Sequence, residues 1–298
     1  MEVAISTIRV AFGADSTSPK SWYDDYIMIP QTHPRRAYAQ EALLQELWKR
    51  QLRTVVLPRD WPLLDEISGS RGNARVLLHR LARAGRLRPI RRGAYAVRNE
   101  RGVVHVSTLE LIGAITMQSH LVTAGRALQE YGLTDQGFRE IVVATPAKER
   151  GWEWQGERVR YVRLPKRQLW GGRDRDGTTI ASPERAILDS LAHPGWGVTL
   201  SQVVEAIGRA HQHDPRFVER LAAAAARYGN TMLARRLGYV TEETIGPDAA
   251  QSFLALRGRS NADAPLVAGL ARKGARDSRW LVAENVPIEA LTDYREVG

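Results

Sequence analysis

Residues 69–98, GSRGNARVLLHRLARAGRLRPIRRGAYAVR, decide the fold expected for the N-terminal part of the chain. Their apolar residues are spaced i, i+3, i+4 and i+7, which forms one stripe of an α-helix: Ala74, Leu77, Leu78 and Leu81. Gly85 is expected to end this helix, because glycine accepts the left-handed conformation of a C-terminal cap. Short strands are expected over 87–90 and 94–97, joined by a three-residue loop that ends in Gly93.

The opposite face of this predicted helix is cationic. At 100° per residue, the centre of this face carries Arg75, Val76, His79 and Arg83. Asn73 and Arg80 lie on its flanks. A helix followed at once by an arginine-tipped hairpin is the arrangement with which a winged helix-turn-helix meets DNA. One element then enters the major groove, and the hairpin lies along a phosphate backbone.

The preceding residues complete this pattern. A helix is expected over 37–51, a strand over 54–57, and a second helix capped by Asp60, while Ser70 is expected to cap the third helix. Helix, strand, helix, turn, helix and hairpin is the winged-helix order. We therefore predict a DNA-binding domain over 35–100, preceded by a loose arm over 1–34 with no recognisable element.

The residue types in this domain suit double-stranded DNA. Arginine presents a planar fork that pairs with the O6 and N7 edge of guanine and equally well with phosphate. Arg75, His79 and Arg83 are expected to reach base edges, Asn73 to read an adenine, and Val76 to contact a thymine methyl group. The other predicted contacts, with phosphates or a minor groove, are Arg86, Arg88, Arg91 and Arg92. Two flanking arginines complete the predicted DNA-binding set, Arg71 and Arg80.

The charge of the chain is unevenly placed. The net charge is +10, and residues 31–100 hold fifteen Lys or Arg against six Asp or Glu, so this segment alone carries +9. A charge confined to one segment favours a polyanion-binding module over a generally basic protein. A coding bias towards arginine is the alternative, since only five lysines occur. That bias does not account for the scarcity of acids between Arg71 and Arg98.

Composition excludes several classes of protein. Cysteine is absent, so disulfides, thiolate metal sites and cysteine nucleophiles are excluded. The sequence contains neither an apolar run that could span a membrane nor a signal-peptide pattern, and we expect a cytoplasmic protein.

Residues 101–298 are predicted to form a larger, mixed α/β domain with a helical segment, which makes the whole chain α+β. Strands are expected over 140–145, 159–164 and 178–181. Helices are expected over 109–118, 183–192, 200–211, 215–228 and 230–242. A further helix is expected to begin at a cap formed by Thr123 and to run to Tyr131. In the tail, 241–298, strands over 264–270 and 279–284 flank a basic segment. This tail either closes the domain, the interpretation we favour, or supplies a second DNA contact.

Several short motifs together resemble the AbiEi family over about residues 40–240. They are Gly93-Ala94-Tyr95, TAGRAL over 123–128, Tyr131-Gly132-Leu133, Ala144-Thr145-Pro146, IASPERAILD over 180–189, and Arg236-Leu237-Gly238. Members of this family are predicted transcriptional regulators that serve as antitoxins in type IV abortive-infection systems. The resemblance implies a winged helix that binds inverted repeats in its own promoter, possibly as a homodimer. It also implies a C-terminal domain that neutralises a nucleotidyltransferase-type toxin, often without stable contact.

The patterns that would indicate an enzyme are weak. Neither a phosphate-binding Gly-x-x-x-x-Gly-Lys loop nor a Gly-x-Ser-x-Gly elbow occurs. His211 and His213 have no third ligand nearby, and the 171–177 loop, with Asp174 and Asp176, is expected to be an ion-paired surface turn. A nuclease is the more serious rival, but none of the five lysines has an acid two residues before it. We therefore expect no catalytic residue, metal or cofactor.

Two functions remain open. The first is a sequence-specific DNA-binding autorepressor that acts as an antitoxin. The second is a nucleic-acid-binding interaction protein whose C-terminal domain neutralises a toxin by direct contact. A regulator without any toxin partner is a simpler form of the first.

Overall fold

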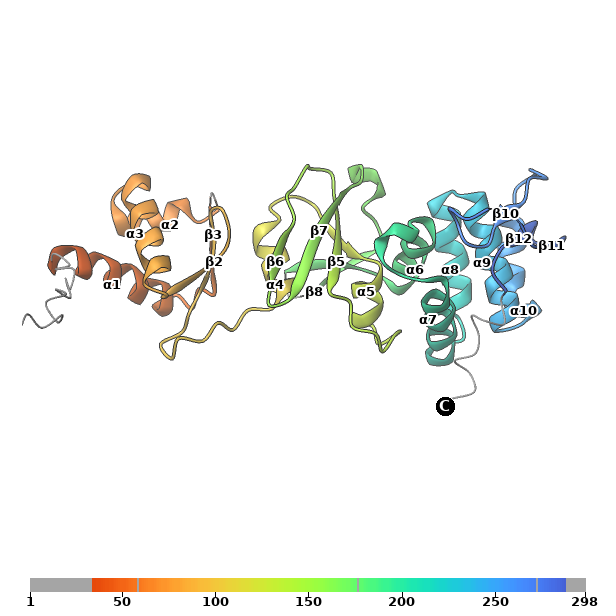
Figure 1. Cartoon of the computed structure of the whole chain (residues 1–298), viewed down its shortest axis with the longest axis horizontal. Coiled ribbons are helices and arrows are strands. Elements are labelled where there is room, and N and C mark those ends of the chain that lie inside the picture. Colours follow the sequence, from red (N-terminus) through yellow and green to blue (C-terminus); the bar gives the residue numbers. More distant parts are fainter. Residues whose placement is uncertain (1–33, 58, 176, 272, 288–298) are drawn as a thin grey trace, which may run out of the picture.

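The computed structural model describes residues 34–57, 59–175, 177–271 and 273–287, and its elements succeed one another along the longest axis of the molecule (Figure 1). An N-terminal helical module with its own small sheet lies at one end. A mixed sheet with helices occupies the middle, and further helices form the other end. The fold class is α+β, as predicted. The predicted arm, apart from Pro34, lies outside the described residues.

The N-terminal module follows the winged-helix order. Its elements are α1 (Pro34–Lys49), β1 (Thr54–Val56), α2 (Trp61–Ser68), α3 (Arg71–Arg83), β2 (Leu87–Arg91) and β3 (Ala94–Val97). The strands form an antiparallel sheet in the order β1-β3-β2. Its buried core is built mainly from leucines at helical spacing: Leu43, Leu44, Leu47, Leu64, Leu78 and Leu81. Burial of this apolar stripe, more than helix propensity, stabilises helices as short as α2.

Two local expectations in this module are wrong. The hairpin has a two-residue loop, because Arg91 pairs with Ala94 after a bulge that follows Pro89. Proline has no N–H for the ladder, so the register shifts there, and Gly93 closes the turn at φ 79°. Asp60 precedes α2 but makes no capping hydrogen bond to it. Its carboxylate instead accepts a hydrogen bond from the Val56 N–H at 2.7 Å.

The middle of the molecule is a six-stranded mixed sheet in the order β6-β7-β5-β4-β9-β8. Its strands are β4 (Leu121–Thr123), β5 (Glu140–Thr145), β6 (Trp152–Trp154), β7 (Glu157–Arg163), β8 (Gly172–Arg175) and β9 (Thr178–Ala181). Its helices are α4 (Thr108–Ile115), α5 (Gly125–Glu130) and α6 (Pro183–Ala192). The predicted strands over 140–145 and 178–181 and the helix over 183–192 are confirmed.

Two expectations for this region are corrected. The 171–177 loop contains an edge strand, β8, which pairs with β9, while Asp176 lies outside the described residues. Thr123 does not cap α5. It is buried, and its hydroxyl donates to the Asp189 carboxylate at 2.6 Å.

The C-terminal part packs helices and a small sheet around α9. Its elements are α7 (Leu200–His213), α8 (Phe217–Tyr228), α9 (Thr231–Thr244), α10 (Pro247–Ala250), β10 (Ala264–Pro265), β11 (Ala275–Asp277) and β12 (Val282–Glu284). Gly238 of α9 lies against the buried indole of Trp280, and a Cβ at residue 238 would come within 2.1 Å of that ring. The tail therefore closes this part of the fold, as favoured from its charge. In the described part of the chain, no helix combines the length and apolarity needed to cross a membrane.

Candidate nucleic-acid interface

Helix α3 has one buried and one open face, as its pattern predicts. The Ser70 hydroxyl accepts a hydrogen bond from the Asn73 N–H at 3.2 Å, which fixes the start of the helix. Ala74, Leu78 and Leu81 are buried in the module core. The side chains on the opposite face are therefore directed to solvent.

Most of the predicted DNA-binding side chains of α3 are exposed. They are Arg71, Asn73, Arg75, Val76, His79 and Arg83, while Arg80 is half-buried. Val76 is 47% exposed, which is unusual for a large apolar side chain in this structure. Its position among the cations is the one predicted for contact with a thymine methyl group.

Trp61, at the start of α2, orders the first turn of this surface. The Arg75 guanidinium lies 5.1 Å from the centre of its ring, and that of Arg71 lies 5.5 Å from it. Arg71 also pairs with Asp65 at 3.3 Å, and the Asn73 amide donates to the Ser68 carbonyl oxygen at 3.3 Å. Sequence reasoning missed Trp61, because nothing in its spacing connects an aromatic residue of α2 with arginines of α3.

Two arginines of the predicted wing contact the middle part of the molecule. Arg88 lies 4.3 Å from the centre of the Trp154 ring, and Arg91 pairs with Glu149 at 3.1 Å. Both partners belong to the middle part of the molecule. On the same side of this small sheet, Ala94 and Ala96 join the larger hydrophobic core. These contacts hold the module against the rest of the chain, so Arg88 and Arg91 already have partners within it. Their predicted phosphate contacts stay predictions.

Arg92 and Arg86 remain at the surface. Arg92, in the hairpin loop, is exposed. Arg86 lies over Trp48, at 5.4 Å from the ring centre, and 3.9 Å from the Glu41 carboxylate. That ion pair is long and exposed, so it would compete only weakly with a phosphate.

Four cationic or titratable side chains of the predicted set have no hydrogen bond, ion pair or ring contact within the described residues. They are His79, Arg80, Arg83 and Arg92. Three of them lie on α3 and one on the adjacent hairpin loop. We call these four residues, together with Arg75, the cationic face. An unneutralised set of this kind attracts polyanions, because desolvating it costs less than breaking existing ion pairs.

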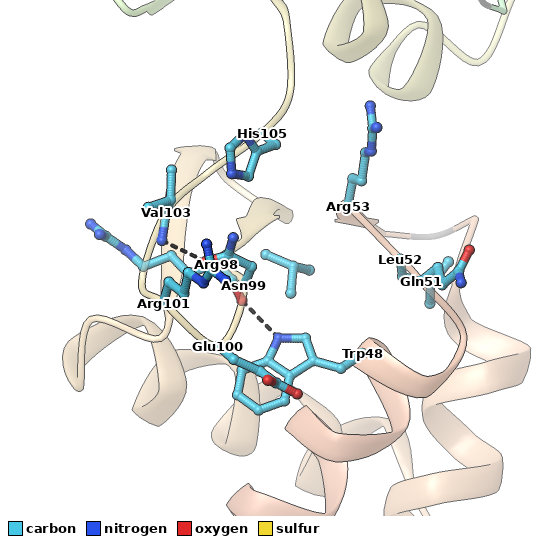
Figure 2. A pocket seen from close by; sticks show the side chains of 11 residues that line it. Trp48, Gln51, Leu52, Arg53, Arg98, Asn99, Glu100, Arg101, Val103 and His105 are labelled. Carbon is cyan, nitrogen blue, oxygen red and sulfur yellow. Dashed lines mark hydrogen bonds between the residues drawn. The ribbon is translucent and has the colours of Figure 1, made fainter.

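A cavity of about 840 Å³ lies where the module joins residues 98–107, the connector that leads to α4 (Figure 2). Trp48 donates from its indole N–H to the Arg98 carbonyl oxygen at 2.7 Å, and the Asn99 side chain accepts from the Val103 N–H at 2.8 Å. The first bond holds the connector against α1, and the second lies within the connector. Arg53, at its edge, forms an ion pair with Glu110 of α4. No predicted DNA-binding residue lines this cavity, which we interpret as a structural junction.

The side chains singled out as conceivable metal ligands lie apart from one another. Among the residues that the structure describes, no three His, Asp or Glu side chains are grouped to hold an ion. His211 is half-buried and His213 is exposed at the end of α7, and Asp174 is exposed on β8.

Comparison of the sequence with protein families and with curated proteins found no match in either. Among solved structures, the chain is similar to the crystal structure of the RV2827C protein from Mycobacterium tuberculosis. The identity is 16%, the TM-score is 0.59, and the similarity covers 82% of this chain and 90% of that one. At this identity the likeness shows the fold alone. It extends across most of both chains, so the succession of parts described above is shared.

Proposed function

We propose that this protein is a sequence-specific double-stranded DNA-binding repressor of its own promoter. The observation that carries this proposal is the cationic face, a set of mostly exposed basic side chains on α3 and its hairpin, most of which lack a partner in the described chain. Exposed guanidinium groups of a third helix preceded by a helix and a turn are suited to base edges and phosphates. Arg88 and Arg91 do not belong to this proposal.

The cellular role that we propose is that of an antitoxin in a type IV toxin–antitoxin system. It is supported by the resemblance of the motifs to the AbiEi family. Most of those motifs have structural explanations here, such as the cap of α6 by Ser182 and the contact of Gly238 with Trp280. We assign no catalytic residue, and the partner we propose is a nucleotidyltransferase-type toxin that is counteracted without stable contact.

The proposal is tested by fluorescence anisotropy with a labelled duplex from the promoter of the gene and a shuffled duplex of equal length. We expect tighter binding to the promoter duplex. The logarithm of its affinity should fall with the logarithm of salt concentration by about 0.9 for each phosphate neutralised. With three or four arginines engaged per protomer, a slope of about 3 to 4 follows from the same rule. Affinity that does not change between low and moderate salt would contradict DNA binding by this face.

The antitoxin role has its own test. An adjacent nucleotidyltransferase-like gene should inhibit growth when expressed alone, and co-expression of this protein should restore growth. Stable capture of that toxin by the tagged protein would favour neutralisation by direct contact, the alternative mechanism. Growth that stays inhibited in the presence of this protein would leave a plain regulator.

Substitutions in the loop and in strand β2 of the hairpin are expected to differ in their effect on DNA affinity. Arg92→Ala should weaken promoter binding by roughly fivefold, which corresponds to about 1 kcal/mol for one arginine that binds a phosphate. Arg88→Ala should change it by less than twofold, because its guanidinium lies over Trp154. Anisotropy titrations of both variants in one buffer check this. A larger effect of Arg88→Ala than of Arg92→Ala would show that the hairpin undocks to bind DNA.

A further inference from the structure

A cavity of about 440 Å³ opens on the C-terminal side of the six-stranded sheet, between the end of β7, the 3₁₀ turn η1 (Lys166–Gln168), and the ends of α6 and α8. Figure 1 shows α6 and α8 on the side of the middle sheet that lies away from α3. Its volume lies in the range of small-molecule sites. It is independent of the DNA-binding proposal, because none of the cationic face lines it.

The walls of this cavity carry only one sign of charge. Its charged side chains are Arg167, Arg185 and Arg227, with the His193 ring beside them, and no carboxylate lines it. Arg185 is neutralised from behind by Asp189, at 2.9 Å. Arg167 and Arg227 are exposed, and neither has an acidic partner within the described residues. The cavity therefore keeps an uncompensated positive charge at its mouth.

The floor of the cavity is rigid. The buried Arg185 donates to the carbonyl oxygen of Gln168 at 2.6 Å, and its guanidinium lies between Trp170, at 4.7 Å, and Tyr228, at 5.3 Å. The Tyr228 hydroxyl donates to Asp189 at 3.1 Å. A guanidinium held by so many contacts is preorganised, so little entropy would be lost when a ligand binds above it.

The mouth of the cavity is cationic and aromatic at once. The exposed Arg227 side chain lies with its guanidinium 4.5 Å from the centre of the Trp170 ring. His193 stacks on Trp196 at 4.0 Å. Burial lowers the pKa of His193, an effect that Arg185 reinforces and Asp189 opposes, so the ring is mainly neutral at pH 7 and available as a hydrogen-bond donor or acceptor. Two arginine forks, a histidine and an indole together suit a phosphate joined to a planar ring.

We propose that this cavity binds a small phosphate monoester with a planar ring, of the mononucleotide class, with its phosphate between Arg167 and Arg227. Guanidinium forks match phosphate oxygens in bidentate geometry. The cavity is larger than a bare phosphate requires, and its aromatic lining accounts for the ring. A duplex is too wide for a space of this volume, so this site is separate from the one on α3.

The test is isothermal titration calorimetry of the full chain with AMP, inorganic phosphate and adenosine. We expect AMP to bind, phosphate to compete with it, and adenosine to bind at least tenfold more weakly than AMP. Equal affinity for AMP and phosphate would contradict recognition of the planar ring. Equal affinity for AMP and adenosine would contradict recognition of the phosphate. Lack of AMP binding at millimolar concentration would overturn the proposal as a whole.

A matched pair of double variants locates the site. Arg167→Ala with Arg227→Ala should weaken AMP binding at least tenfold. Arg139→Ala with Arg158→Ala removes the same charge from exposed positions outside the cavity and should leave AMP binding within twofold. Both variants replace exposed side chains, and thermal unfolding checks that they remain folded. Equal weakening by the two double variants would show that only the overall charge matters and would overturn the assigned site.

Discussion

Replacing Arg75, Arg83 and Arg92 together by alanine is expected to lower the affinity for the promoter duplex at least a hundredfold. Each side chain is exposed, and two of the three have no partner in the described chain. Removing an arginine that reads a base or a phosphate costs about 1–3 kcal/mol, so three removals cost at least about 3 kcal/mol, which exceeds the roughly 2.7 kcal/mol of a hundredfold change. The salt slope should also fall, by about 0.9 for each phosphate that the variant no longer neutralises.

The control for this triple variant removes the same charge elsewhere. Arg139→Ala, Arg158→Ala and Arg216→Ala together alter exposed side chains outside the N-terminal module. If the net charge alone attracted DNA, both triple variants would weaken binding equally. We expect the control to retain specific affinity within about threefold, a decrease set by long-range attraction that salt screens. Retention of promoter binding by the α3 variant, with its fold intact by circular dichroism, would mean that another surface binds DNA.

The N-terminal module was predictable because its signals are local. The leucine spacing of α3 and its Ser70 cap depend on residues within a few turns of each other, and the buried and open faces follow from them. The same is true of β5 and of the Ser182 cap of α6. The boundaries of each of these elements can be predicted from residues close together in the sequence.

The contacts that the sequence does not reveal join distant residues. Its type and its place in a hairpin predict that Arg88 contacts DNA, but they give no sign of its partner Trp154, 66 positions later. Arg91 meets Glu149, and Thr123 meets Asp189, across similar separations. Arginine is equally suited to a phosphate, an indole or a carboxylate, so its type alone could not decide among them. Only the fold, which docks one side of the hairpin sheet on the middle part, makes that choice.

The same limitation concealed the polar cluster behind α6. Within 180–189, Ser182 and Leu188 predict a capped, amphipathic helix, and the cap and the buried Leu188 are confirmed. The i, i+4 pair of Arg185 and Asp189 resembles an ordinary surface pair in sequence, yet both side chains are at most 2% exposed. The partners that cover them come from β4, η1 and α8, and sequence spacing gives no sign of them.

Asp189→Ala is expected to reduce the free energy of unfolding by about 3–5 kcal/mol, the usual cost of leaving one partner of a buried ion pair without the other. The Asp189 carboxylate accepts from Thr123 and Tyr228 and neutralises Arg185. Its removal leaves a buried guanidinium without a counter-ion and two hydroxyl groups without their acceptor. Urea unfolding followed by tryptophan fluorescence measures the decrease, which should appear as a lower midpoint with little change in slope.

Two further variants test whether the expected loss of unfolding free energy comes from the buried charge. One removes a surface ion pair, and the other removes both buried charges while keeping apolar volume. Asp135→Ala breaks the exposed pair with Arg209, where the Asp135 side chain is 81% exposed, and should cost less than about 1 kcal/mol. Arg185→Met combined with Asp189→Leu removes both charges and keeps apolar volume, so it should be less destabilising than Asp189→Ala alone. If the double variant were the less stable of the two, the hydrogen bonds of Arg185 to the η1 turn, and not the charge of Asp189, would dominate this cluster.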